Sequence, residues 1–166
     1  MKFKVETYPL NLMRENLPEG RTVKGLFSSK PSSMPPRRMT NVRLGELISE
    51  LSDEVKGQLG YWQFLVQQRD VLVITDEHHN RMRIMTPVTS EDKLDAEELS
   101  RLLSANFDRA LDAKYAISNE TLWSVFTHPL AELTDEQFIG CVGQVVTLAD
   151  NFGTSYSSSG LYFGGG

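Results

Sequence analysis

Apolar side chains recur every three or four residues from Leu44 to Leu59. This spacing places them on one face of an α-helix. Gly60 follows directly, and glycine commonly ends a helix. The pattern therefore predicts an amphipathic helix with the apolar positions Leu44, Leu47, Ile48, Leu51, Val55 and Leu59.

Three candidate strands follow this helix. "YWQFLVQQ" (61–68) and "VLVIT" (71–75) flank a predicted bend at Arg69–Asp70, and "RMRIMTPV" begins at residue 81. The segments are rich in β-branched and aromatic residues and are separated by short polar bends. These features predict three strands joined by hairpins.

The bend at residues 77–80 determines which side chains of the third strand face the core. A four-residue loop places Asp76 opposite Arg81 and turns Met82 and Ile84 toward the apolar side of the preceding strand. A five-residue loop would turn arginines toward that side instead. The even loop makes the better core, so we predict it.

Two later segments carry the signals of a helix start. In "LDAEEL" (94–99), Asp95 is a candidate N-cap, and in "LTDEQF" (133–138) Thr134 is the N-cap with Gln137 three residues on. Such side chains satisfy the free amides of the first helical turn. Each segment also has the two apolar positions of a hydrophobic staple, which are Leu94 with Leu99 and Leu133 with Phe138.

Between these helices, "KYAIS" (114–118) and "TLWSVFTHP" (121–129) flank Asn119–Glu120 and predict a second hairpin. The predicted order is helix, three strands, helix, two strands, helix. Runs of strands joined by short bends predict the α+β class, with an antiparallel sheet of about five strands and helices packed on it.

The chain of 166 residues is expected to contain one domain, residues 40–152. Residues 1–39 are predicted to be an N-terminal extension that ends in a linker, because "SSKPSSMPPRRM" (28–39) is rich in serine and proline. Residues 153–166 are uncharged and rich in glycine and serine, which predicts a flexible tail.

The predicted sheet is apolar on both sides. One side carries Trp62, Phe64, Val66, Val71 and Val73. The other side carries Tyr61, Leu65, Leu72, Ile74 and Met85. In the last strand, Leu122 and Phe126 point away from Trp123 and Val125 and are expected to lie on this other side too. The candidate partner-binding residues are Leu65, Leu72, Ile74, Met85, Leu122 and Phe126. A patch of this size is expected to be covered by helices, the N-terminal extension, a second copy of the chain or a client peptide.

Charge is divided unevenly along the chain. Residues 1–45 contain nine Lys and Arg against three acids, and residues 46–166 contain eight against nineteen. The acidic body argues against nucleic acid as a partner, because phosphate repels it. No apolar run is long enough for a membrane span and "MKFKVETYPL" lacks the apolar core of a secretory signal, so a cytoplasmic location is expected.

Three histidines and one cysteine are the candidate chemical groups. In an extended chain His78 and His79 point to opposite sides, and the one other histidine, His128, is distant in sequence. We therefore interpret "TDEHHNRMRI" (75–84) as a hairpin tip and predict no metal or other cofactor. Cys141 lies among apolar residues, which predicts a buried structural thiol. A small metal-dependent hydrolase that uses the three histidines is the alternative.

The predicted order of elements and the acidic body resemble the type III secretion chaperone-like fold. The stretch that carries the resemblance is "LDAEELSRLLSANFDRALDAKYAISNETLWSVFTHPLAELTDEQFIGCVGQVVTLADNF" (94–152), in which a helix leads to a hairpin and then to an acidic-capped final helix. The resemblance covers roughly residues 40–152. It extends to the related YbjN-type sensory-transduction-regulator domains of bacteria.

This resemblance implies a homodimer that binds an extended segment of another protein without ATP or metal. The predicted function is therefore a non-enzymatic, chaperone- or adaptor-like binding module. The alternative within binding proteins is a YbjN-type regulatory or stress-response domain with a signalling protein as its partner.

Overall fold

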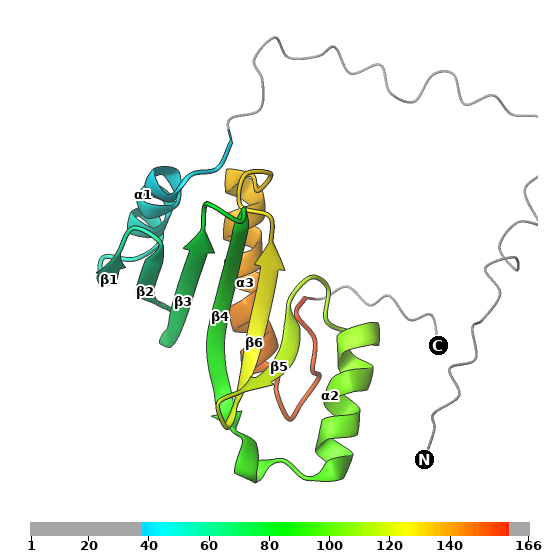
Figure 1. Cartoon of the computed structure of the whole chain (residues 1–166). Helices are drawn as coiled ribbons and strands as arrows, with labels where there is room; N and C mark the ends of the chain where they lie inside the picture. The colour runs from blue at the N-terminus through cyan, green and yellow to red at the C-terminus, as the bar shows by residue number, and fades with distance from the viewer. Residues whose placement is uncertain (1–37, 160–166) are drawn as a thin grey trace, which may run out of the picture. The chain divides into compact units, whose positions relative to one another are not determined.

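A sheet of six antiparallel strands forms the centre of residues 38–159, the part of the chain that the computed structural model describes (Figure 1). The strands lie in the order β1-β2-β3-β4-β6-β5. The predicted α+β class is confirmed, with one strand more than expected. The strands are β1 (Val55–Gln58), β2 (Tyr61–Val66), β3 (Arg69–Asp76), β4 (Arg81–Ser90), β5 (Lys114–Ser118) and β6 (Thr121–His128).

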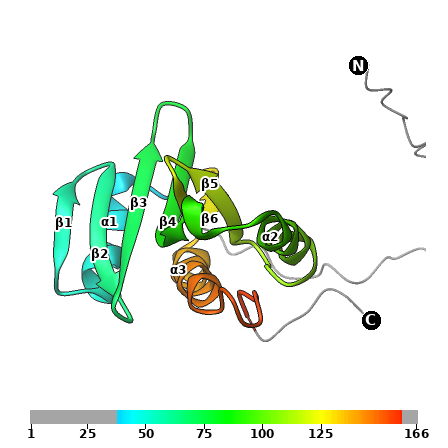
Figure 2. The same cartoon turned by 90° about the horizontal axis from the view of Figure 1, so that it is seen from below.

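Three α-helices pack on this sheet. Helices α1 (Asn41–Leu51) and α3 (Asp135–Asp150) cover one face, α1 over β2 and α3 over β3, β4 and β6 (Figure 2). Helix α2 (Ala96–Asp108) follows a short 3₁₀ turn, η2 (Glu91–Lys93), and lies beside the edge strand β5.

The first helix is shorter than predicted. It ends at Leu51, because Ser52 is in an extended conformation, and Val55 begins β1 instead of a further helical turn. Val55 still packs against the core, whereas Leu59 is 64% exposed. Gly57 has φ +117°, and a Cβ there would lie 2.2 Å from the carbonyl oxygen of Tyr61. The glycine therefore permits the close approach of β1 to β2, which the helical spacing concealed.

The β2–β3 turn lies two residues earlier than predicted. Gln67 and Gln68 form it with φ 50° and 68°, and the predicted turn residues Arg69 and Asp70 belong to β3. The shift is even, so the predicted core side is kept, with Trp62 opposite Val73. Positive φ at both positions gives the type I′ twist that suits a two-residue hairpin, although glutamine rarely adopts it.

Four other local predictions are confirmed. Asp76 pairs with Arg81 around the four-residue loop, and Asn119–Glu120 turns the chain between β5 and β6. The side chain of Asp95 accepts a hydrogen bond from the backbone N–H of Glu98 (2.8 Å). Thr134 and Gln137 form a reciprocal capping box at the start of α3.

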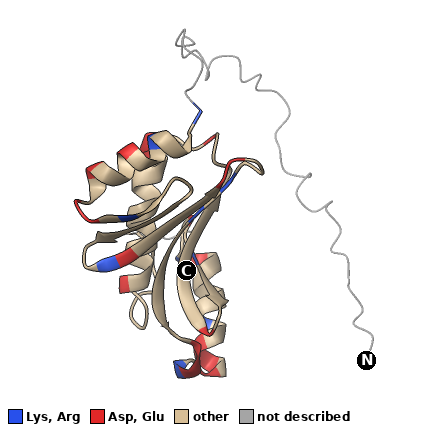
Figure 3. Ribbon diagram, turned by 60° about the vertical axis from the view of Figure 1, so that its left-hand side comes forward, with Lys and Arg blue, Asp and Glu red and all other residues tan. Residues whose placement is uncertain are grey.

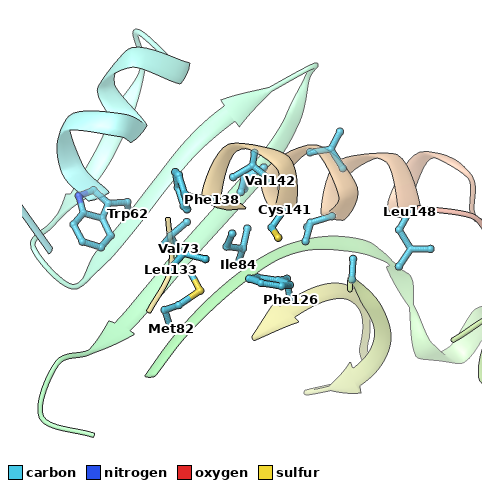
Figure 4. Packing of buried hydrophobic residues seen from close by; sticks show 14 of the residues in the cluster. Trp62, Val73, Met82, Ile84, Phe126, Leu133, Phe138, Cys141, Val142 and Leu148 are labelled. Atoms are coloured by element: carbon cyan, nitrogen blue, oxygen red, sulfur yellow. The ribbon is translucent and has the colours of Figure 1, made fainter. Parts of the chain in front are cut away.

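The core lies between the sheet and helices α1 and α3 (Figure 4). Cys141 is buried in it, as predicted. The largest side chains with almost no exposure come from both layers; they are Phe64, Phe138, Leu44, Ile48, Ile84, Leu122, Leu133, Leu148, Val71, Val73, Val145 and Val146. Burying each of these contributes roughly 1.5–3 kcal/mol of transfer free energy.

Residues 153–159, the described start of the predicted tail, make contacts that the composition of the segment did not predict. Residues 153–159 return along α2, and Ser157 and Ser158 are buried. The Oγ atom of Ser158 accepts a hydrogen bond from the N–H of Leu111 (2.7 Å), and the hydroxyl of Tyr156 donates to Glu98 (2.7 Å). Composition alone concealed these contacts, because serine serves here as a hydrogen-bonding core residue.

The predicted extension also contributes at its last residue, since Met39 is buried and its N–H bonds to the carbonyl of Ala131 (3.3 Å). Residues 1–37 and 160–166 lie outside the described residues. The predicted short strands "KFKVE" and "TVKGLF" and most of the predicted linker fall in the first of these segments.

Candidate functional site

The face of the sheet opposite α1 and α3 carries no helix within residues 38–159. We call it the open face and define its apolar part as Tyr61, Leu65, Leu72, Ile74, Met85, Trp123 and Val125. Leu65 is 43% exposed and Ile74 is 37% exposed, so the open face presents large apolar side chains to solvent. Figure 3 shows long stretches of the strands without charged residues.

Strand register aligns the apolar residues of the open face in a row. Leu72 lies directly opposite Met85, and Met85 lies directly opposite Val125. The row therefore runs without a polar interruption across β3, β4 and β6. Beside it, Trp123 is held in place because its indole N–H donates to the carbonyl of Ser118 (3.1 Å).

The open face is hollowed in two places. A groove of about 660 Å³ runs over β4, β6 and β5, with Met85, Trp123 and Val125 among its lining residues. A second hollow of about 410 Å³ lies at the other end of β4, beside Ile74. Arg83 and Thr127 line both. The hollows are therefore adjacent and share a boundary.

Four of the six predicted partner-binding residues lie on the open face: Leu65, Leu72, Ile74 and Met85. The placement of Leu122 and Phe126 on this side is wrong, because they point into the core with 1% and 5% exposure.

Trp123 and Val125 occupy the open face in their place. Strand β6 is apolar at successive positions, so its alternation does not define its inner side. The strand register defines the inner side, because Phe126 lies opposite Ile84, which is fully buried. The inner side of β6 also carries Ser124, which is buried and whose hydroxyl has no hydrogen-bond partner in the described structure.

A second apolar surface lies on α2. Leu103 is 72% exposed and Phe107 is 86% exposed, although both side chains are large and apolar. A groove of about 290 Å³ with almost entirely apolar walls separates α2 from β5. We call Leu99, Leu103, Phe107 and Ile117 the α2 patch.

The histidine segment is a hairpin tip. His78 and His79 are both exposed, and His79 Nδ1 lies 2.6 Å from a carboxylate oxygen of Asp76. Hydrogen bonds from the backbone and ring of His79 lower the pKa of the Asp76 carboxyl. His128 instead stacks on Phe126.

Within residues 38–159, no three His, Cys, Asp or Glu side chains are placed to hold a metal ion together. Burial also raises the pKa of the Cys141 thiol to about 11, so the sulfur is protonated near neutral pH and is a poor nucleophile.

No family model matches the sequence, and no curated protein matches it. Solved structures match the fold. The crystal structure of the ExsC–ExsE complex has a TM-score of 0.52 at 16% identity, and the match covers 66% of this chain and 90% of that chain. The HopA1–SchA chaperone–effector complex has a TM-score of 0.52 at 8% identity, covering 68% and 94%. The Yersinia pestis type III secretion chaperone SycH, in complex with a stable fragment of YscM2, has a TM-score of 0.51 at 14% identity, covering 66% and 95%.

The chain therefore has a type III secretion chaperone-like fold, as the resemblance in its sequence implied. The YbjN-type part of that resemblance stays a prediction. Among the helices of residues 38–159, none is both long and apolar enough to cross a membrane.

Proposed function

We propose that this protein is a non-enzymatic, chaperone-like module that binds an extended segment of another protein through the open face. The observation that carries the proposal is the apolar row Leu72–Met85–Val125, which no helix covers within residues 38–159. Leu65, Ile74 and Trp123 extend the contact surface on both sides of this row. The place of action is the cytoplasm.

The similar structures support this proposal by what they contain. ExsC was solved with ExsE, SchA with HopA1, and SycH with a fragment of YscM2. Each of these three similar structures is therefore a complex with a second protein. The proposed activity needs only burial of apolar surface, at about 25 cal/mol per Å², and no bond is broken.

The partner is expected to lie across the open face and not to extend β5. An added strand needs free N–H and C=O groups along a sheet edge. At Tyr115, both outward-pointing backbone groups are already hydrogen-bonded to the side chain of Asn106. Alternate side chains of an extended segment would instead fill the hollows of the face.

We also propose that the α2 patch joins two copies of the chain. Leu103 and Phe107 lie one turn apart on α2, so they form one exposed apolar ridge next to the groove along β5. A symmetric pair could place the ridge of each copy in the groove of the other. The dimer would leave both open faces available.

Binding is tested with a permanently unfolded polypeptide labelled with a fluorophore, by fluorescence anisotropy. Ile74→Ser removes an apolar residue of the open face, and Ile139→Ser removes one of similar exposure (45%) from the outer side of α3. We expect Ile74→Ser to weaken binding about tenfold and Ile139→Ser to leave it unchanged. Equal effects of the two variants, or no binding by the wild type, contradict the proposal.

The dimer is tested by size-exclusion chromatography with light scattering, with and without residues 1–37, a truncation that keeps the buried Met39. The wild type is expected to have twice the mass of one chain in both forms, and Phe107→Ser is expected to have the mass of one chain. A single-chain mass for the wild type contradicts the proposed dimer but leaves the binding surface in place.

A further inference from the structure

The open face carries two cations that the rest of the fold leaves uncompensated. Arg81 and Arg83 are exposed, and within residues 38–159 the guanidinium group of neither has a hydrogen bond or an ion pair. The other arginines of the helices and of β3 behave differently, because they donate to protein oxygen atoms; these are Arg43, Arg69, Arg101 and Arg109.

The acids near these two arginines are already engaged. Asp76 is paired with His79, and Asp70 accepts a hydrogen bond from Gln63 (3.1 Å). Asp112, at the far end of the larger groove, accepts one from Gln144 (3.1 Å). These hydrogen bonds do not cancel the charges of the acids. The side chains that line the two hollows nevertheless include three cations, Arg81, Arg83 and Lys114, against two carboxylates, Asp76 and Asp112. The lining is therefore net positive, although residues 46–166 carry eleven more acidic than basic residues.

Arg81, Arg83 and Met85 are successive residues on one side of β4, about 7 Å apart. Arg83 lies between Ile74 of β3 and Thr127 of β6, directly beside the apolar row. It also lines both hollows. An extended segment repeats its side chains at the same spacing, so an apolar residue over Met85 brings its next side chains over the two arginines.

We infer that the segment bound by the open face is both apolar and acidic, with carboxylates that pair with Arg83 and Arg81 beside apolar residues that fill the groove. This inference rests on the proposed function and names the chemistry of its partner. Guanidinium binds carboxylate through paired hydrogen bonds, which fixes the register of the segment on the face. A nucleic acid is disfavoured, because the acidic body repels a long run of phosphates.

The test uses three labelled peptides of twelve residues and a single-stranded oligonucleotide of the same length. Each peptide repeats two apolar residues followed by four Glu, Gln or Lys residues, so that each side of the extended peptide carries one apolar and then two polar side chains, matching Met85, Arg83 and Arg81. Affinity is measured by anisotropy at low and moderate salt. We expect the Glu peptide to bind at least tenfold more tightly than the Gln peptide, and the Lys peptide to bind most weakly. The advantage of the Glu peptide should shrink as salt is added.

Arg83→Glu reverses the charge at the shared boundary of the hollows. It is expected to abolish the preference for the Glu peptide and to favour the Lys peptide. A circular dichroism spectrum and a urea denaturation midpoint like those of the wild type show that the variant is folded. Arg101→Gln, which removes an arginine of α2 that is paired with Glu97 and Glu98, is the matched control and should keep the wild-type order.

Each other result overturns the inference. Equal affinity of the wild type for the Glu and Gln peptides overturns it and leaves the proposed function standing, because both peptides bind. A preference for Glu that survives Arg83→Glu places the carboxylates elsewhere. Oligonucleotide binding that depends on Arg83 assigns the cations to phosphate. Failure of all three peptides, together with failure of the unfolded polypeptide, contradicts the inference and the proposed function alike.

Discussion

The side-chain amide of Asn106 makes both hydrogen bonds that a neighbouring strand would make to Tyr115. Its nitrogen donates to the carbonyl of Tyr115 (3.0 Å), and its oxygen accepts from the N–H of the same residue (2.7 Å). Helix α2 therefore closes the edge of the sheet at β5. Free strand edges promote association with other chains, so this contact hinders the addition of a strand at Tyr115.

Asn106→Ala is expected to lower the free energy of unfolding by about 1–3 kcal/mol, because it leaves two backbone groups of Tyr115 without partners. Urea denaturation followed by circular dichroism measures the change. Asn106→Asp keeps the acceptor but loses the donor, so its effect should be intermediate. A change below about 0.5 kcal/mol for Asn106→Ala would show that the contact is dispensable.

Thr134→Ala is expected to lower the free energy of unfolding by about 1 kcal/mol. The Thr134 hydroxyl accepts from the N–H of Gln137 (3.2 Å), and the Gln137 side chain accepts from the N–H of Thr134 (2.9 Å). Thr134→Ser keeps the hydroxyl and should cost little, as a control. If serine and alanine have the same effect in urea denaturation, the hydroxyl is not the stabilising group.

The Cys141 thiol is expected to make stability fall at high pH. Burial raises its pKa to about 11 from an ordinary value near 9. Its contribution is therefore complete below pH 9 and is lost as the pH rises toward 11, by up to about 3 kcal/mol. Cys141→Ala should show a smaller loss over this interval in urea denaturation. Identical pH profiles for the two proteins contradict a raised pKa.

The histidine hairpin is expected to be dispensable for function. His79→Ala removes one exposed ion pair with Asp76 and should leave binding of the unfolded polypeptide unchanged. Elemental analysis of the purified wild type measures bound metal. Stoichiometric zinc or iron that is lost in His79→Ala would support the metal-dependent alternative and contradict our interpretation.

The sequence predicts most of the fold where local chemistry decides the structure. The capping box at Thr134 depends on residues three apart, and the loop after Asp76 depends on which side chains of β4 are apolar. Both predictions are confirmed. In each case one segment contains all the information that the prediction needs.

Predictions fail where distant pairing decides the structure. Val55 fits a helical stripe, yet the close approach of Gly57 to Tyr61 makes it part of a strand. Phe126 fits either side of β6, and only its pairing with Ile84 buries it. Phe107 is a large apolar residue of α2, yet it is 86% exposed. The sequence of the helix alone does not show that no other described element covers this side chain.

The fluorescence of Trp123 tests most directly whether a partner covers the open face. Trp62, the one other tryptophan, is buried in the core, and Trp62→Phe leaves Trp123 as the single reporter. A tryptophan-free unfolded polypeptide is titrated into this variant while emission and acrylamide quenching are recorded. The account predicts that the Trp123 emission shifts to the blue and that quenching falls as the complex forms. Binding that leaves Trp123 as accessible as before would contradict it.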